Sequence, residues 1–319
     1  MSLLLDGVLL AAGFALILKG GGLFVDSAVR IAARYRLPRA FVGMTLVSFA
    51  TTTPEFVVSA TGAWLGNTGI AYGNAVGSAI VNIGLILAIL LLGSAIVPDS
   101  SSRISWLVMA GAGLLVLLLA ADGGLERPEG ALFLGLLALF LIRSTGRALS
   151  GREPPAGSGA PAGPASREWL RFLAGTGMVV GGARLLVHGA ASLALSLGVP
   201  EVVLGLTLVA VGTSLPELVV AVTSLLRRVS DISLGNIAGA NLLNFLWILG
   251  ASSVIRDIPV GRDLLLRDGA AMMGVMLIPA LFMALRRPLG RAAGLLLLGL
   301  YAAYLALLLS GPVPVPGPG

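Results

Sequence analysis

Two Pro-Glu pairs lie in the middle of long apolar stretches, Pro54-Glu55 in the first half of the chain and Pro216-Glu217 in the second. A carboxylate near the centre of a bilayer costs at least about 2.5 kcal/mol, so an ionisable residue there is by default a functional candidate. The proline beside it has no N–H and clashes with the carbonyl one turn earlier, which frees that oxygen. Carboxylate and carbonyl oxygens are hard ligands that suit Ca²⁺ or Na⁺.

Hydroxyl and amide side chains accompany both carboxylates at helical spacing. Thr51 precedes Glu55 by four residues and Thr213 precedes Glu217 by four, so each hydroxyl shares a helix face with its carboxylate. The further oxygen-bearing candidates are Thr52, Ser214, Ser78, Asn82 and Asn244. Taken singly, such residues also hold helices together by hydrogen bonds. The structural alternative for the glutamates is an internal salt bridge, but neither motif stretch contains Lys or Arg. An oxygen-only set favours a hard cation over zinc or copper.

The Pro-Glu pairs belong to an internal repeat with an offset of 162 positions, the separation of Glu55 from Glu217. GMTLVSFATTTPEFVVSA (43–60) matches GLTLVAVGTSLPELVVAV (205–222) at nine of eighteen positions, and the same offset aligns GNAVGSAIVN with GNIAGANLLN. Shared hydrophobicity does not explain a gap-free match across two stretches, so we infer a duplication. Glycines of the second motif predict close helix packing, because they let backbones approach. These glycines are Gly73, Gly77, Gly235 and Gly239.

The elements that must position these residues are membrane-spanning helices. Of 319 residues, 57% are hydrophobic and 11% charged, whereas soluble domains carry about 25% charged residues. The apolar runs are long enough to span a bilayer core as helices, and strand-like alternation is absent, which argues against a barrel. The sequence predicts an all-α polytopic membrane protein with ten spans: 3–29, 40–63, 71–93, 104–121, 130–147, 169–195, 201–225, 233–255, 267–285 and 291–310.

The chain divides into two similar halves. Residues 1–150 form the first five-helix repeat and 167–311 the second; the Pro-, Gly-, Ala- and Ser-rich segment 151–166 predicts a flexible cytoplasmic linker, and 312–319 an extended tail. Five is an odd number, so the second repeat enters the membrane from the opposite side and the repeats are inverted. Inverted repeats are typical of secondary transporters, whose site lies at the midplane between them.

Charges outside the motifs indicate orientation. Loops after spans 1, 3, 5, 7 and 9 carry fifteen arginines and the other loops four. The positive-inside rule therefore predicts a multi-pass cell-membrane protein with both termini extracytoplasmic. The absence of cysteine and the single histidine, His188, exclude thiolate and multi-histidine metal sites. The net charge of +6 is not interleaved with aromatic residues, so we expect no nucleic-acid partner.

The two motif pairs resemble the signature repeats of the sodium/calcium exchanger family, within the cation/calcium exchanger superfamily, in its prokaryotic type. The ten-span plan extends this resemblance over nearly the whole chain. The resemblance implies two inverted five-helix repeats, both termini outside, and four cation sites between the signature helices. The matching ligand positions are Thr51, Thr52, Glu55, Ser78 and Asn82 in the first repeat, and Thr213, Ser214, Glu217 and Asn244 in the second, with backbone carbonyls near Ser48 and Ala210.

Two positions depart from the family pattern. Ala240 stands where the family usually has serine, which removes a hydroxyl that would help to bind Na⁺. Asn244 stands where some prokaryotic and potassium-dependent members have aspartate. The first change leaves the Na⁺ stoichiometry open, and the second argues against a dependence on potassium.

We expect a secondary active antiporter that exchanges Ca²⁺ for Na⁺ by alternating access and works as a monomer in the lipid bilayer. It would be no enzyme and would need no cofactor. An H⁺/Ca²⁺ antiporter is the alternative, because a buried carboxylate can load a proton and Ala240 lacks a hydroxyl. A cation channel has no need for inverted halves. An intramembrane hydrolase would need a nucleophile and a base that face each other.

Overall fold

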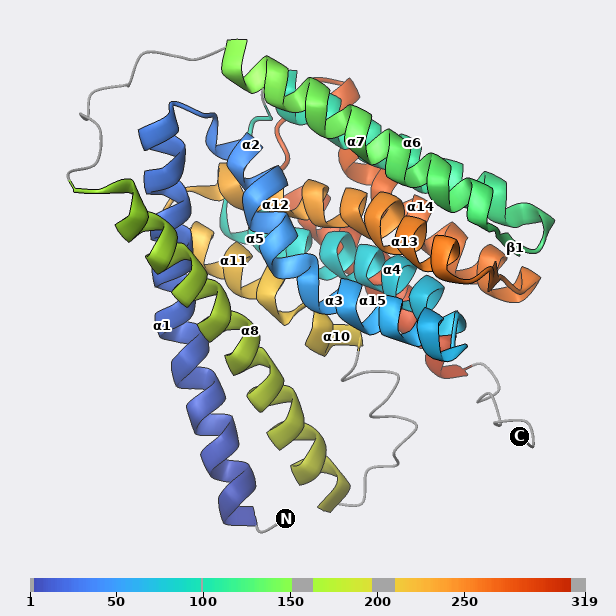
Figure 1. The fold of residues 1–319 in the computed structure, drawn as a ribbon, viewed down its shortest axis with the longest axis horizontal. Coiled ribbons are helices and arrows are strands. Elements are labelled where there is room, and N and C mark those ends of the chain that lie inside the picture. Colours follow the sequence, from blue (N-terminus) through green and yellow to red (C-terminus); the bar gives the residue numbers. More distant parts are fainter. Residues whose placement is uncertain (1–2, 99, 151–162, 197–209, 311–319) are drawn as a thin grey trace.

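The computed structural model describes residues 3–98, 100–150, 163–196 and 210–310, and these are helical almost throughout (Figure 1). The first half contains α1 (Leu3–Tyr35), α2 (Arg39–Val42), η1 (Gly43–Val47), α3 (Ser48–Leu65), α4 (Gly69–Val81), η2 (Asn82–Leu87), α5 (Ala88–Gly93), α6 (Ser100–Leu119), η3 (Ala120–Asp122) and α7 (Arg127–Ser150). The second half contains α8 (Ala165–Ser196), α10 (Ala210–Thr213), α11 (Leu215–Leu226), α12 (Ser230–Leu243), η5 (Asn244–Ile248), α13 (Leu249–Ile255), α14 (Arg262–Ala284) and α15 (Arg291–Ser310). Strands β1 (Gly124–Leu125) and β2 (Ile258–Pro259) pair antiparallel.

The predicted all-α membrane fold of two inverted five-helix repeats is confirmed. In the described part of the chain, nine helices are long and apolar enough to cross a membrane, and α11 is a shorter apolar helix. The first residues of the predicted span 201–225 lie outside the described residues, as do the tail 312–319 and residues 151–162 of the predicted linker. Helix α8 begins at Ala165, two residues before the predicted linker ends. Its start follows Pro164, whose carbonyl accepts from the Arg167 N–H at 3.2 Å.

The repeat is visible in the helix boundaries. Helices α5 and α13 end at Gly93 and Ile255, so these two ends keep the offset of 162. The π-helical segments η2 and η5 also begin at equivalent asparagines of the two second motifs. Single π-helical turns inside α-helices often accompany functional sites, because they change the direction of the side chains that follow.

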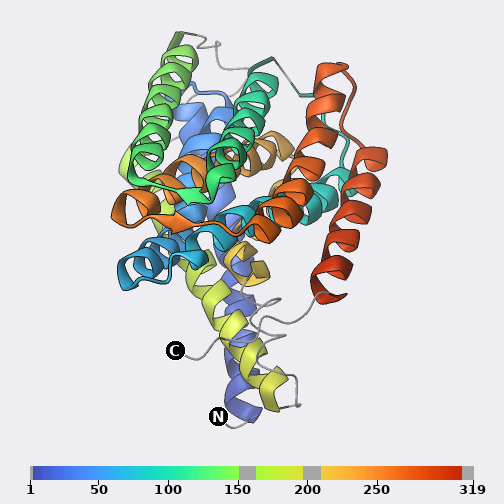
Figure 2. The ribbon, with the colours of Figure 1, turned by 90° about the vertical axis from the view of Figure 1, so that its right-hand side faces the viewer.

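Helices α1 and α8 form a pair that extends beyond the other helices (Figures 1 and 2). Glycines let the two backbones meet: a Cβ built on Gly13 would lie 2.8 Å from the Gly182 carbonyl oxygen, and one built on Gly182 would lie 2.8 Å from that of Gly13. The rings of Phe24 and Phe172, one from each helix, pack with their centroids 4.7 Å apart. The pair is therefore held together along much of its length.

The second motifs lie in the centre of the remaining helices. In the 18-residue apolar stretches of the spans 69–93 and 230–255, 78% and 83% of the residues are buried, compared with 17% in the span formed by α7. Figure 2 shows α7 at one side of this group and α15 at the other. The Trp247 ring of η5 stacks on Phe56 of α3 with centroids 4.2 Å apart. This contact fixes the first signature helix against the second half of the chain.

Candidate cation site

Both signature carboxylates are buried between the two halves. Glu55 on α3 and Glu217 on α11 are each 1% exposed. Among the described residues, no basic side chain forms an ion pair with either of them. The Oε2 atom of each carboxylate has no hydrogen-bond partner there. The salt-bridge explanation therefore finds no support in the described residues.

Hydroxyls of α3 reach across to the second half. The Thr52 hydroxyl donates to Oε1 of Glu217 at 3.5 Å. The Thr51 hydroxyl lies 3.3 Å from Oδ1 of Asn236 on α12 and 3.3 Å from the Ser48 carbonyl oxygen. The sequence predicts these threonines beside Glu55 on their own helix, and the structure also places them beside Glu217 and Asn236 of the other repeat.

The asparagines that begin the π-helical segments contribute amide oxygens. Asn82 donates through Nδ2 to Oδ1 of Asn241 at 3.0 Å. The Oδ1 atoms of Asn82 and Asn244 are buried without a partner in the described part of the chain. Buried polar atoms are paired in most proteins, so these unpartnered oxygens need an explanation.

The remaining predicted ligands lie at the ends of helices. Ser48 begins α3, and its hydroxyl donates to the Met44 carbonyl oxygen at 2.6 Å. Ser214 separates α10 from α11 with φ −86° and ψ 6°, and within the described residues its buried hydroxyl has no partner. Ala210 and Thr213 are the first and last residues of α10. Ser78 is buried, and its hydroxyl lies 3.5 Å from Oδ1 of Asn74.

Three asparagines of the site were not predicted from the sequence. Asn74 donates to the Glu55 carbonyl oxygen at 3.2 Å and to the Ser59 hydroxyl at 2.9 Å, and Asn236 and Asn241 form the contacts described above. Asn74 and Asn236 are related by the offset of 162, so a search for repeated polar residues would have found them. Asn241 has an alanine as its repeat partner, and no signal in the repeat marks it.

The predicted close packing at the glycines of the second motif is seen at Gly235 and Gly239. A Cβ on Gly235 would clash with the Ala40 carbonyl oxygen, and one on Gly239 would clash with that of Met44. Helix α12 therefore packs directly against α2 and η1 through positions that have no side chain. For Gly73 and Gly77 the close packing stays a prediction, because the repeat equivalents of Ala40 and Met44 are residues 202 and 206, which lie outside the described residues.

The carboxylate pair sets the charge of the site. The described residues contain no group of three or more His, Cys, Asp or Glu side chains that could hold a metal ion. Two carboxylates with amide, hydroxyl and carbonyl oxygens nonetheless make a donor set for hard cations.

A family model described as "Sodium/calcium exchanger protein" matches residues 6–146 and 167–310. The chain belongs to this family. It is similar to a putative antiporter, CaxA, of Alkalimonas amylolytica (33% identity, covering 97% of this chain and 100% of the relative). It is also similar to the sodium/calcium exchanger MaX1 of Methanosarcina acetivorans (31% identity, covering 94% and 97%). A solved structure of the sodium-calcium exchanger NCX_Mj, soaked with 2.5 mM Na⁺ and 10 mM Sr²⁺, matches with 29% identity and a TM-score of 0.85, over 96% of this chain and 99% of that one. The chain is thus a multi-pass membrane antiporter of the ion-exchanging type.

Proposed function

We propose that this exchanger is a secondary active antiporter that moves Ca²⁺ against Na⁺ across the cell membrane, with Glu55 and Glu217 as its central cation ligands. The observation that carries the proposal is a set of buried, unpartnered oxygens on elements of both halves. They are Oε2 of Glu55 and Glu217, Oδ1 of Asn82 and Asn244, and the hydroxyl of Ser214, within the described residues. Such oxygens are the ligands that Ca²⁺ and Na⁺ take in proteins.

The charge of the site explains how the two ions would compete. Glu55 and Glu217 carry −2 when both are ionised, which one Ca²⁺ or two Na⁺ would neutralise. Because the same oxygens would serve both ions, binding of one excludes the other. An empty site would keep its charge, and closing it inside a low-dielectric protein would be unfavourable. This barrier favours coupled exchange by alternating access over uncoupled leak.

The inverted repeats support the rest of the proposal. Each half of one chain contributes ligands to the site, so we propose that a monomer transports without a cofactor. The fifteen arginines of the odd-numbered loops support an orientation with these loops in the cytoplasm and both termini outside. The names of MaX1 and NCX_Mj, both sodium/calcium exchangers, support Na⁺ and Ca²⁺ as the exchanged ions.

Exchange of Ca²⁺ against H⁺ is the second candidate, and one residue favours it. Ala240 is fully buried on α12 and is the repeat equivalent of Ser78. The second half therefore lacks a hydroxyl at this position, which weakens the case for a full set of Na⁺ ligands. A proton, in contrast to Na⁺, can be bound by a carboxylate alone, without further oxygen ligands.

Fluxes driven by separate gradients distinguish the two candidates. Purified protein in liposomes would be tested for uptake of radiolabelled Ca²⁺, driven by an outward Na⁺ gradient in one arm and by a pH gradient in the other. We expect uptake with the Na⁺ gradient and none with the pH gradient. Uptake with the pH gradient alone would replace Na⁺ by H⁺, and no uptake in either arm, with intact monodisperse protein, would reject both candidates. Protein-free liposomes give the background.

A further inference from the structure

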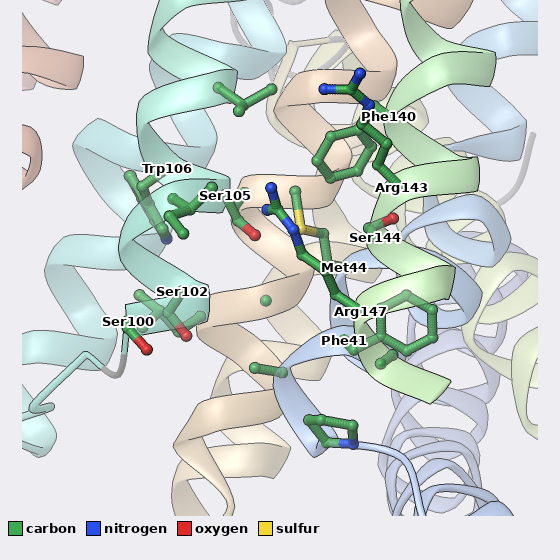
Figure 3. Close-up of a pocket in the computed structure, with 18 residues that line it drawn as sticks. Phe41, Met44, Ser100, Ser102, Ser105, Trp106, Phe140, Arg143, Ser144 and Arg147 are labelled. Atoms are coloured by element: carbon green, nitrogen blue, oxygen red, sulfur yellow. The ribbon is translucent and has the colours of Figure 1, made fainter. Parts of the chain in front are cut away.

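A cavity lies at the arginine-rich end of the molecule, and neither of the two glutamates lines it. It has a volume of about 530 Å³ and is enclosed by the start of α2, the start of α6, the end of α7 and one face of α12 (Figure 3). No predicted cation ligand is among its lining residues. The positive-inside rule places this end at the cytoplasmic surface of the membrane.

Two arginines make the cavity electropositive. Arg143 and Arg147 lie one turn apart on α7, and both line the cavity. Figure 3 shows the Arg147 side chain extending from α7 across the space toward α6. Neither guanidinium forms an ion pair with an acidic side chain of the described residues. A cation would be repelled here, so the cavity is unsuited to be an entry path for Ca²⁺ or Na⁺.

Neutral hydrogen-bond donors complete an anion-binding lining. Ser100 and Ser105 of α6 and Ser144 of α7 line the cavity, and the Ser144 hydroxyl donates to the Leu141 carbonyl oxygen at 3.3 Å, which leaves its oxygen lone pairs free. Ser100 is the first residue of the 20-residue helix α6, so backbone N–H groups and the positive end of the helix dipole lie at the same place. Trp106 also lines the cavity; it is 1% exposed, and its indole N–H has no partner among the described residues. A buried donor without a partner is costly, and any acceptor that came within its reach would relieve that cost.

The walls indicate an amphiphile and argue against a small soluble anion. Phe41, Met44 and Phe140 form apolar walls beside the arginines. Ile104 and Val108 line the cavity and are also exposed, by 43% and 38%, on the outer surface of α6. The polar lining therefore continues directly onto an apolar outer surface of a membrane-spanning helix, where acyl chains lie.

From this geometry we propose that the cavity binds the phosphate head group of an anionic phospholipid of the cytoplasmic leaflet. Arg143 and Arg147 hold the phosphate, the serine hydroxyls and the α6 N-terminus bind its oxygens, and an acyl chain runs along Ile104 and Val108. Basic pockets between transmembrane helices on the cytoplasmic side are known to take such head groups. The proposal does not depend on which ion drives the exchange.

Native mass spectrometry of delipidated, detergent-solubilised protein tests the proposal. Phosphatidylglycerol would be titrated against the wild type, against the double variant Arg143→Gln/Arg147→Gln, and against Arg287→Gln/Arg291→Gln. The last pair is exposed, lies on the same predicted side and removes the same charge outside the cavity. We expect a loss of about 30-fold in lipid affinity for the cavity variant, since each basic residue near an anionic lipid contributes roughly five-fold, and little change for the control.

Further arms separate the possible occupants. Ser144→Leu keeps both arginines but fills the cavity, and it should weaken phosphatidylglycerol binding in protein that remains monodisperse. Phosphatidylcholine should bind no better to the wild type than to the cavity variant. Equal phosphatidylglycerol affinity in all three proteins would overturn the proposal. It would also be overturned if excess inorganic phosphate displaced the lipid completely, because the cavity would then be a site for free phosphate.

Discussion

The two signature helices share their sequence motif but not their backbone. Helix α3 runs unbroken from Ser48 to Leu65 with Pro54 in its interior. In the second half, the equivalent stretch is interrupted at Ser214, and Pro216 lies at the start of α11. A proline in the first turn leaves no donor unpaired, whereas one in the interior removes a hydrogen bond. The same Pro-Glu pair therefore sits inside a helix in one half and at a helix start in the other.

The polar side chains around the two carboxylates also differ between the halves. The first half supplies Thr52, whose hydroxyl is committed to Glu217, and the second supplies Ser214, whose hydroxyl has no partner in the described residues. In the repeat alignment, Ser78 of the first half is equivalent to Ala240 of the second, and Asn241 of the second half is equivalent to Ala79 of the first. The duplication conserved the carboxylates and let their surroundings diverge, so the two halves offer different oxygen-bearing groups to the proposed site.

Removing either carboxylate should have the largest effect on transport. Glu55→Gln and Glu217→Gln keep the side-chain volume but remove a charge and a strong ligand. Loss even of a supporting group at a metal site costs about 10- to 100-fold, so we expect each variant to lower Na⁺-driven Ca²⁺ uptake in liposomes at least about 100-fold. Size-exclusion chromatography checks that the protein is intact. Near-normal transport by one of the two variants would show that only one half binds the ion.

A matched pair of glycine variants tests the close packing of α12 against η1. Gly239→Ala places a methyl group against the Met44 carbonyl oxygen and should destabilise the protein by about 1–3 kcal/mol or more. Gly111→Ala changes an exposed position of α6, where the added methyl group meets nothing within 4 Å among the described residues. It should be neutral or stabilising by up to about 1 kcal/mol, because alanine favours a helix. Thermal unfolding in detergent measures both, and equal destabilisation by the two variants would contradict the close packing at Gly239.

These contrasts show which features of the molecule can be predicted from the sequence and which cannot. The sequence predicts the carboxylates, their hydroxyl neighbours and the number of spans. It does so because residue type, helical spacing and the offset of 162 are local or periodic features of the chain. Which backbone atoms the glycines of α12 meet depends on where α12 lies relative to α2, and no periodicity of the sequence carries that information. The same holds for Asn241, whose contact with Asn82 joins residues 159 positions apart and has no repeat equivalent.

The hydroxyls allow a finer test, with an effect of intermediate size. Thr52→Val removes the hydrogen bond to Glu217, and loss of a bond to a charged group should lower the apparent Ca²⁺ affinity about ten-fold. Ser214→Ala removes a hydroxyl without a protein partner in the described residues, and if that oxygen binds a cation, the affinity should fall several-fold. The Ca²⁺ dependence of uptake measures both.

Stability and Ca²⁺ uptake of the Ser214→Ala protein, measured together, show whether the Ser214 hydroxyl is a cation ligand or only a buried group without a partner. A buried hydroxyl without any partner is a cost, so its removal should stabilise the ion-free protein by about 1–3 kcal/mol whether or not it is a ligand. A more stable protein with unchanged uptake would remove Ser214 from the proposed site. A more stable protein with weaker Ca²⁺ affinity would keep it there.

The smallest expected effect comes from restoring the symmetry at Ala240. Ala240→Ser gives the second half the hydroxyl that Ser78 provides in the first, and one added neutral ligand should raise the apparent Na⁺ affinity by about three-fold. Ser78→Ala is the mirror variant and should lower it by a similar factor. Both are read from the Na⁺ dependence of Ca²⁺ uptake. If Ala240→Ser leaves that dependence unchanged while Ser78→Ala weakens it, the hydroxyl at 240 cannot reach the ion, and the asymmetry between the halves extends from residue type to geometry.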